Sequence, residues 1–95
     1  MDEDERRERM TELARSFPTL RTAPGVDPWE PTELNRWAVG PRSPGERLAA
    51  RFALNLWNQS AGWECGPFEV FEALARWDAE HCRAFARWAE DPWWP

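Results

Sequence analysis

Apolar positions recur at helical spacing in the first segment of the chain, residues 3–16, which is otherwise rich in Glu and Arg. One helix face has apolar residues at i, i+3, i+4 and i+7, and this spacing is that of Met10, Leu13, Ala14 and Phe17. We predict a helix over residues 3–16 that Pro18 ends. Its first turns carry charge on every face, so the pattern leaves open whether residues 1–9 are ordered or frayed.

Residues 18–31 show no such pattern and contain four prolines, at positions 18, 24, 28 and 31. Because proline fixes φ and has no amide donor, this segment is incompatible with a helix or a central strand. We expect an extended, Pro-rich strap over the surface, with a flexible linker as the alternative. The apolar side chains that could anchor the strap are Leu20, Val26 and Trp29. Residues 31–39 then predict a short helix, which Gly40-Pro41 ends.

The clearest helix start lies at Ser43-Pro44-Gly45-Glu46, with Ser at the cap, Pro in the first helical position and Glu three residues after the cap. We predict a helix from Pro44 to about Gln59. Its polar residues fall within an arc of about 80° and comprise Arg47, Arg51, Asn55 and Asn58. A helix that is apolar over most of its circumference is surrounded on several sides, so this one is predicted to be central.

A last helix is predicted to begin at Gly66-Pro67 and to continue to Glu90, since nothing breaks the pattern before Asp91-Pro92. Its apolar face comprises Val70, Phe71, Leu74, Trp77, His81, Cys82, Phe85, Trp88 and Ala89. The fold class is therefore all-α. We expect a small single-domain bundle of about four helices over residues 1–95, with the Pro-rich strap between the first two helices and a Trp-rich tail at 91–95.

Composition sharpens this expectation and excludes some chemistry. Eight Trp and five Phe in 95 residues indicate an aromatic core. The basic residues are 12 Arg and no Lys, and Tyr is also absent, so Schiff-base or P-loop lysines and a phenolic acid are excluded. A GC-rich bacterial or phage genome accounts for this bias.

Charge is uneven along the chain. The net charge is −5, and residues 2–12 hold six acids against three Arg. No basic patch marks a nucleic-acid surface, so direct nucleic-acid binding is not expected. No apolar leader or 18-residue apolar stretch is present, which predicts a cytoplasmic location and no membrane contact.

Asp78 and His81 are the first candidates for chemistry, because they lie three residues apart within the predicted apolar face. They could form half of a metal site, or a carboxylate-oriented general base. The interpretation we favour is a hydrogen-bonded pair inside the bundle, or a pair that meets Arg47 or Arg51. We therefore assign no metal, cofactor or catalytic residue, and keep Asp78 and His81 as metal candidates only across an oligomer interface.

Cys65 and Cys82 are about 25 Å apart along a continuous helix, too far for a disulfide. Cys65 precedes the predicted helix start, where the helix dipole lowers the pKa of a thiol. A buried, unreactive thiol is nevertheless favoured over a nucleophile, since the only imidazole, His81, lies about four turns away.

The tryptophans divide into two groups. Trp57, Trp77 and Trp88 lie on apolar helix faces and are predicted to be core. Trp93 and Trp94 follow the last helix, and docking against the domain is favoured for them, with binding to a partner as the alternative. Trp63 leaves the same two possibilities open, so the candidate partner-binding residues are Trp63, Trp93 and Trp94. Together with the lack of a catalytic motif, this favours a non-enzymatic protein–protein interaction module, a small cytoplasmic accessory protein of bacterial or phage type.

Its partner is expected to be another protein or a second copy of the chain. Two other functions stay open. One is a metal-binding or redox protein that uses Asp78 and His81 across an oligomer interface. The other is an acidic inhibitor that mimics nucleic acid through residues 2–12.

Overall fold

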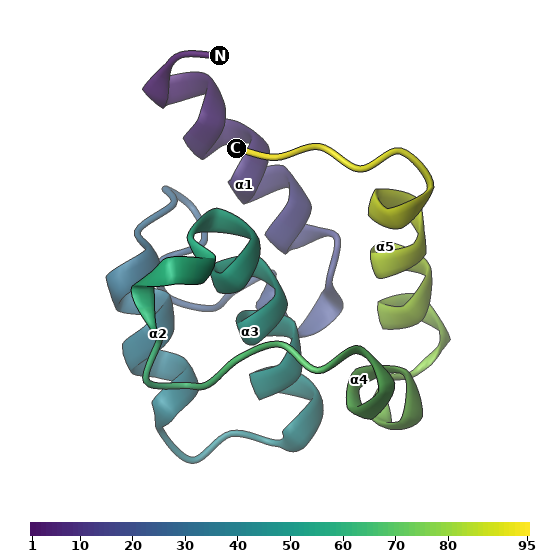
Figure 1. Cartoon of the computed structure of the whole chain (residues 1–95). Coiled ribbons are helices and arrows are strands. Elements are labelled where there is room, and N and C mark those ends of the chain that lie inside the picture. The colour runs from purple at the N-terminus through teal and green to yellow at the C-terminus, as the bar shows by residue number, and fades with distance from the viewer.

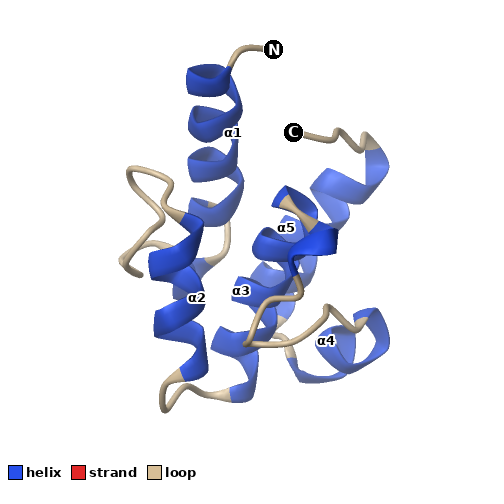
Figure 2. Cartoon of the chain, turned by 60° about the vertical axis from the view of Figure 1, so that its left-hand side comes forward, coloured by secondary structure: helices blue, strands red, loops and turns tan.

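The computed structural model describes residues 1–95 and is entirely helical (Figures 1 and 2). The α-helices are α1 (Glu3–Arg15), α2 (Pro31–Val39), α3 (Pro44–Trp57), α4 (Val70–Arg76) and α5 (Ala79–Glu90). Two 3₁₀ turns, Pro18–Leu20 and Gln59–Ala61, complete the regular structure. The predicted fold class is confirmed, with five helices rather than about four. None of the helices combines the length and the hydropathy needed to cross a bilayer.

Helix α3 lies at the centre and packs against α1, α2 and α4. Its start is the predicted capping box: the Ser43 hydroxyl accepts from the Glu46 amide, and the Glu46 carboxylate accepts from the Ser43 amide at 2.9 Å. The helix ends at Trp57, two residues before the predicted Gln59, because the backbone of Asn58 is extended. The wide apolar arc is therefore covered by neighbours, as the sequence pattern predicts.

The polar arc of α3 binds backbone carbonyls of the adjoining loops. Arg47 donates to the carbonyls of Ala38 and Gly40, at 3.1 and 3.0 Å. Arg51 donates to the carbonyl of Cys65. Asn55 donates to the carbonyl of Gly66 at 3.1 Å. The contacts of Arg51 and Asn55 fix the segment that leads from α3 to α4, and those of Arg47 fix the end of α2.

The Pro-rich strap is packed against the first helix. Its three predicted anchors, Leu20, Val26 and Trp29, are each at most 1% exposed. Thr11 of α1 donates to the carbonyl of Val26 at 2.6 Å, and Arg7 donates to the carbonyl of Trp29 at 2.7 Å. The strap is thus held by its side chains and by its backbone, and its first residues form a 3₁₀ turn.

The predicted continuous helix over 67–90 is wrong. The chain leaves helical geometry at Trp77, whose φ and ψ are −74° and 148°. Asp78 then caps a new helix, its carboxylate accepting from the His81 amide at 2.9 Å. Residues 66–69 are also non-helical, and α4 begins at Val70. The break turns α5 relative to α4 (Figure 1) and lets the Trp77 ring enter the core at 7% exposure.

The buried apolar residues form one contiguous cluster, and it is aromatic as the composition indicates. Phe52 lies at its centre, with ring centroids of Phe68, Phe85 and Trp88 at 5.1 to 5.3 Å. Trp77 is buried as predicted, whereas Trp57 and Trp88 are only partly buried and pack against the cluster. The aromatic network therefore reaches the surface on the α5 side.

Candidate functional site

A hollow of about 620 Å³ opens between the end of α3, the segment 67–70, α5 and the C-terminal tail. We call it the apolar groove. It is lined by Phe52, Asn55, Leu56, Gln59, Pro67, Phe68, Val70, Phe85, Trp88 and Trp94. None of these residues is charged, although 31% of the chain is Asp, Glu or Arg. Such a surface suits an apolar ligand, with the two amides available to orient it.

Each of the other four hollows contains charged side chains, which sets the apolar groove apart. The hollow between α1 and α5, for example, is lined by Arg9, Glu12, Arg87 and Asp91 among others. Charged side chains keep water at those surfaces, because removing them from water is costly. The groove is the concave surface that loses water most readily.

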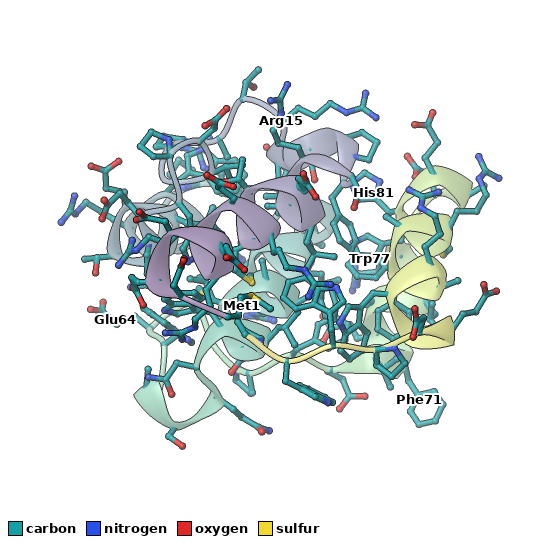
Figure 3. The ribbon with its side chains drawn as sticks, turned by 90° about the horizontal axis from the view of Figure 1, so that it is seen from above. Met1, Arg15, Glu64, Phe71, Trp77 and His81 are labelled. Atoms are coloured by element: carbon teal, nitrogen blue, oxygen red, sulfur yellow. The ribbon has the colours of Figure 1, made fainter.

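Apolar surface continues from the groove onto α4. Phe71 is 80% exposed and Leu74 is 45% exposed. Val70, which lines the groove, lies four residues before Leu74 and so shares its side of the helix. Figure 3 shows Phe71 pointing away from the body, whereas Trp77 and His81 point into it. Large exposed side chains beside a groove are typical of an interaction surface.

The C-terminal tail runs back from α5 toward α1 (Figure 1), and both of its tryptophans contact Trp88. Trp88 lines both the apolar groove and the hollow between α1 and α5. Trp93 lies in that second hollow, with the Arg9 guanidinium 4.1 Å from its ring centroid, and its carbonyl accepts from Trp88 Nε1 at 3.1 Å. Trp94 lies in the groove, edge-on to Trp88 at 5.3 Å, and is 70% exposed. The tail is thus docked through Trp93 and presents Trp94.

Trp63, the third tryptophan predicted to bind a partner, lies elsewhere. Its indole N–H donates to the carbonyls of Leu54 and Asn58, at 2.9 and 3.0 Å. Both carbonyls also accept a backbone amide, that of Leu54 from Asn58 and that of Asn58 from Ala61, so Trp63 adds a second hydrogen bond to each at the end of α3. Trp63 lines none of the hollows.

Asp78 and His81 form the favoured hydrogen-bonded pair, but not within an apolar face. The side chain of Asp78 is 69% exposed at the cap of α5, whereas His81 is 4% exposed. His81 Nδ1 lies 2.8 Å from the carboxylate, and Nε2 lies 2.9 Å from the hydroxyl of Thr19, which sequence reasoning missed. Neither Arg47 nor Arg51 takes part, since both bind loop carbonyls.

Hydrogen bonds from His81 lower the pKa of the Asp78 carboxyl, the backbone N–H contributing most and the side chain next. With the proton on Nδ1, Nε2 can accept from both the hydroxyl and the amide of Thr19, the latter at 3.4 Å. Both ring nitrogens are then engaged. The hydrogen bonds among Thr19, His81 and Asp78 thus connect the 3₁₀ turn of the strap to α5.

A carboxylate, an imidazole and a hydroxyl in this order can activate a nucleophile. Substrate must also reach the hydroxyl, and none of the five hollows is lined by Thr19, Asp78 or His81. No three His, Cys, Asp or Glu side chains gather where they could hold a metal ion. The geometry fits a structural role, in which these hydrogen bonds hold the strap against α5.

Cys65 is buried, as the favoured interpretation predicts, and the alternative of a pKa lowered by the helix dipole is not supported. Burial raises the pKa of this thiol, and the nearby Arg51 offsets that effect only in part. The reason is positional: Cys65 is 4% exposed and α4 begins five residues later, beyond the first turn in which a helix dipole acts. Both cysteines are free thiols, although the continuous helix that separated them in the prediction does not exist.

Comparison with known proteins finds no family, no curated protein and no solved structure that the chain matches. The groove is therefore judged on its own geometry. Sequence reasoning missed it because its lining comes from four separate segments. The available signal was Trp94, one of the three partner-binding candidates, which does line the groove.

Proposed function

We propose that this chain is a non-enzymatic protein–protein interaction module, and that the apolar groove binds an apolar segment of its partner. The observation that carries the proposal is the uncharged groove, which the largely exposed Trp94 lines, with the exposed Phe71 next in the chain to the groove residue Val70. Its volume of about 620 Å³ lies within the range of about 300–1,000 Å³ that is common for ligand sites.

The energetics favour binding at this surface. Fully covering an exposed aromatic side chain contributes about 1.5–3 kcal/mol, and tryptophan is among the residues that most often dominate interface energies. Trp94 already rests edge-on against Trp88, and Trp93 is docked beside it. Such preorganisation lowers the entropy lost when a partner binds.

The two other functions considered from the sequence gain no specific support. A metal site on Asp78 and His81 would have to displace the hydrogen bonds that engage both ring nitrogens. Within the acidic segment 2–12, Glu3 pairs with Arg6 and Arg7 at 2.8 and 3.0 Å, which neutralises part of the charge that mimicry of nucleic acid requires.

Selection of random peptides against the immobilised chain tests the proposal. The selected peptides are expected to be apolar and to bind at least about tenfold more weakly to Val70→Glu, which places a charge in the groove. Ala75→Glu is the matched control, because it adds the same charge to an exposed position of α4 outside the groove.

Circular dichroism and thermal unfolding first establish that both variants fold like the wild type. Peptides that bind Val70→Glu as tightly as the wild type would place binding elsewhere and contradict the proposal. Failure to select any binding peptide would count against it as well.

A further inference from the structure

We infer that the apolar groove is filled by Phe71 of a second copy of the chain, in a two-fold contact in which each copy inserts its ring into the other. This inference rests on the proposed function and names the partner at the same site. Its basis is that one region of the surface carries both a protruding aromatic ring and a hollow lined by aromatic rings.

Helix α4 is apolar over more of its circumference than the rest of the chain covers. Ala73 is fully buried and Val70 lines the groove, whereas Leu74 is 45% exposed and Phe71 is 80% exposed. With about 100° between successive residues, Leu74 and Phe71 lie about 40° and about 100° around the helix from Val70. The apolar stripe of α4 therefore continues from the groove to the outer side of the helix, where the chain leaves it uncovered.

Phe71 cannot fill the groove of its own chain. It is the most exposed large apolar side chain of the protein. Its position on α4, away from the side that carries Val70, directs the ring outward, and Figure 3 shows it pointing away from the body. The ring and the groove nevertheless adjoin at Val70. A second copy related by a two-fold axis can therefore bring each ring to the groove of the other, as a self-complementary contact requires.

The groove suits an aromatic ring in both size and chemistry. A cavity of about 150 Å³ is enough to bind benzene, so the groove, of about 620 Å³, has room for a phenyl ring and part of Leu74. Trp94 stands edge-on to Trp88 and is largely exposed, so it is free to pack against the inserted ring. Half of the ten lining residues are aromatic: Phe52, Phe68, Phe85, Trp88 and Trp94.

The charges near this face do not oppose a contact between identical copies. Like charges that face each other across an interface disfavour association. The groove lining holds none, and Glu72 and Arg76, which pair with each other at 3.8 Å, lie on the opposite side of α4 from the apolar stripe. The Glu69 carboxylate accepts from the Phe71 amide at 3.2 Å and so stays at the start of α4. The inserted ring thus meets an uncharged surface.

The exposed apolar area is that of a modest dimer. An aromatic side chain buries about 150–250 Å², so the exposed parts of Phe71 and Trp94 supply about 300 Å² per copy and about 600 Å² for two copies. Leu74 and the walls of the groove add to this area. Stable interfaces bury about 1,200–2,000 Å² in total. We therefore expect reversible association, with a Kd of about 1–100 µM.

Sedimentation velocity at concentrations that bracket this Kd tests the inference. We expect the mass to rise from that of one chain to that of two. Phe71→Ala removes the inserted ring and should weaken association at least about tenfold, as truncation of a central aromatic residue commonly does. Val39→Ala is the matched control and should leave the Kd unchanged, because it shortens a side chain that is 47% exposed on α2 and lies outside the groove.

A mixture of two variants tests the reciprocal geometry. Leu56→Glu places a charge on the α3 wall of the groove and keeps Phe71, whereas Phe71→Ala keeps the groove. Each variant alone should be monomeric, but the mixed pair retains one ring in one groove and should associate more tightly than either variant with itself. Because the chain has no Lys, an amine-reactive dye labels only the N-terminus, and energy transfer between two dyes reports the mixed dimer.

Circular dichroism first establishes that the variants fold, and Val70→Glu serves as a second groove variant. A wild type that stays monomeric throughout overturns the inference, as does a dimer that Phe71→Ala and Val39→Ala weaken equally. Folded variants that do not recover association when mixed overturn it as well. In each case the proposed function stands if the random selection yields peptides that Val70→Glu binds more weakly, which would identify another protein as the occupant. The proposed function falls only if that selection fails.

Discussion

The region before residue 60 and the region after it bury different kinds of side chain. The largest fully buried residues all lie in the first region: Trp29, Phe17, Met10, Leu20, Leu34, Leu48, Leu54 and Val26. Beyond residue 60 the buried residues are Cys65, Ala73, Trp77, His81 and Ala84, of which only Trp77 is large and apolar. The second region keeps Phe71, Leu74 and Trp94 largely exposed.

This difference separates the side chains that stabilise the fold from those to which the proposed function assigns recognition. Helices of 7 and 12 residues, as α4 and α5 are, have little stability alone and depend on docking. They dock through Trp77 and His81, whose rings meet that of Phe17 at 5.3 and 5.9 Å. The first region therefore provides most of the core, and the second packs on it while Phe71, Leu74 and Trp94 stay exposed.

The largest expected effect comes from a pair of identical substitutions, one in each region. Leu34→Ala empties a fully buried position and should lower the free energy of unfolding by about 2–5 kcal/mol. Leu74→Ala acts on a side chain that is 45% exposed and should change it by about 0.5 kcal/mol or less. Urea unfolding measures the stability of both variants. Comparable losses of stability in the two would contradict the division between a buried first region and an exposed second region.

A smaller effect is expected at the cap that attaches α5. Asp78→Ala removes the acceptor of the His81 amide and of its ring, so the urea midpoint should fall, by less than in Leu34→Ala. Asp78→Asn keeps a capping oxygen and should recover part of the loss. Equal midpoints in wild type and Asp78→Ala would show that the cap contributes nothing.

The same carboxyl should make stability depend on pH. Because the folded-state pKa of Asp78 is depressed, its contribution is fully present above the unfolded-state value of about 3.9 and is lost as the pH falls through the folded-state pKa. Asp78→Asn should therefore show a flatter fall in stability below about pH 4. Glu46 in the first region, whose pKa the Ser43 amide lowers, should give the same sign in Glu46→Gln.

The smallest effect is expected where the tail meets α1. Arg9→Gln removes the cation over Trp93, a contact that contributes about 0.5–1 kcal/mol at an exposed site. Arg9→Lys should keep most of it. With fluorotryptophan in the protein, the ¹⁹F resonance of Trp93, assigned through Trp93→Phe, should shift in Arg9→Gln while the global midpoint barely changes. An unshifted resonance would mean that Arg9 does not hold the tail.

The parts of the fold that the sequence predicts are those decided by local chemistry. Ser43 and Glu46 mark the start of α3 because a capping box needs only four consecutive residues. The break at Trp77 was missed because apolar periodicity continues across it without Gly or Pro. A local signal was nevertheless present, since Asp78 is a preferred cap residue for the helix that follows.

The site is less predictable because it depends on the tertiary arrangement. Trp93 docks against Arg9, which lies more than eighty residues earlier in the chain. The partner of His81 on its second nitrogen, Thr19, is likewise distant in sequence. The sequence supplied Asp78 and His81 as neighbours on one helix, but the tie to the strap and the uncharged groove arise only when separate segments meet.

The edge-on pair of Trp88 and Trp94 has a spectroscopic consequence. Two indole rings at 5.3 Å and 87° form a chiral pair of coupled transition dipoles, which gives a circular dichroism couplet distinct from the helical background. Because one ring is anchored in the protein and the other stands in the groove, a ligand that moves Trp94 changes the couplet without any label. The groove thus carries an intrinsic optical reporter of its own occupancy.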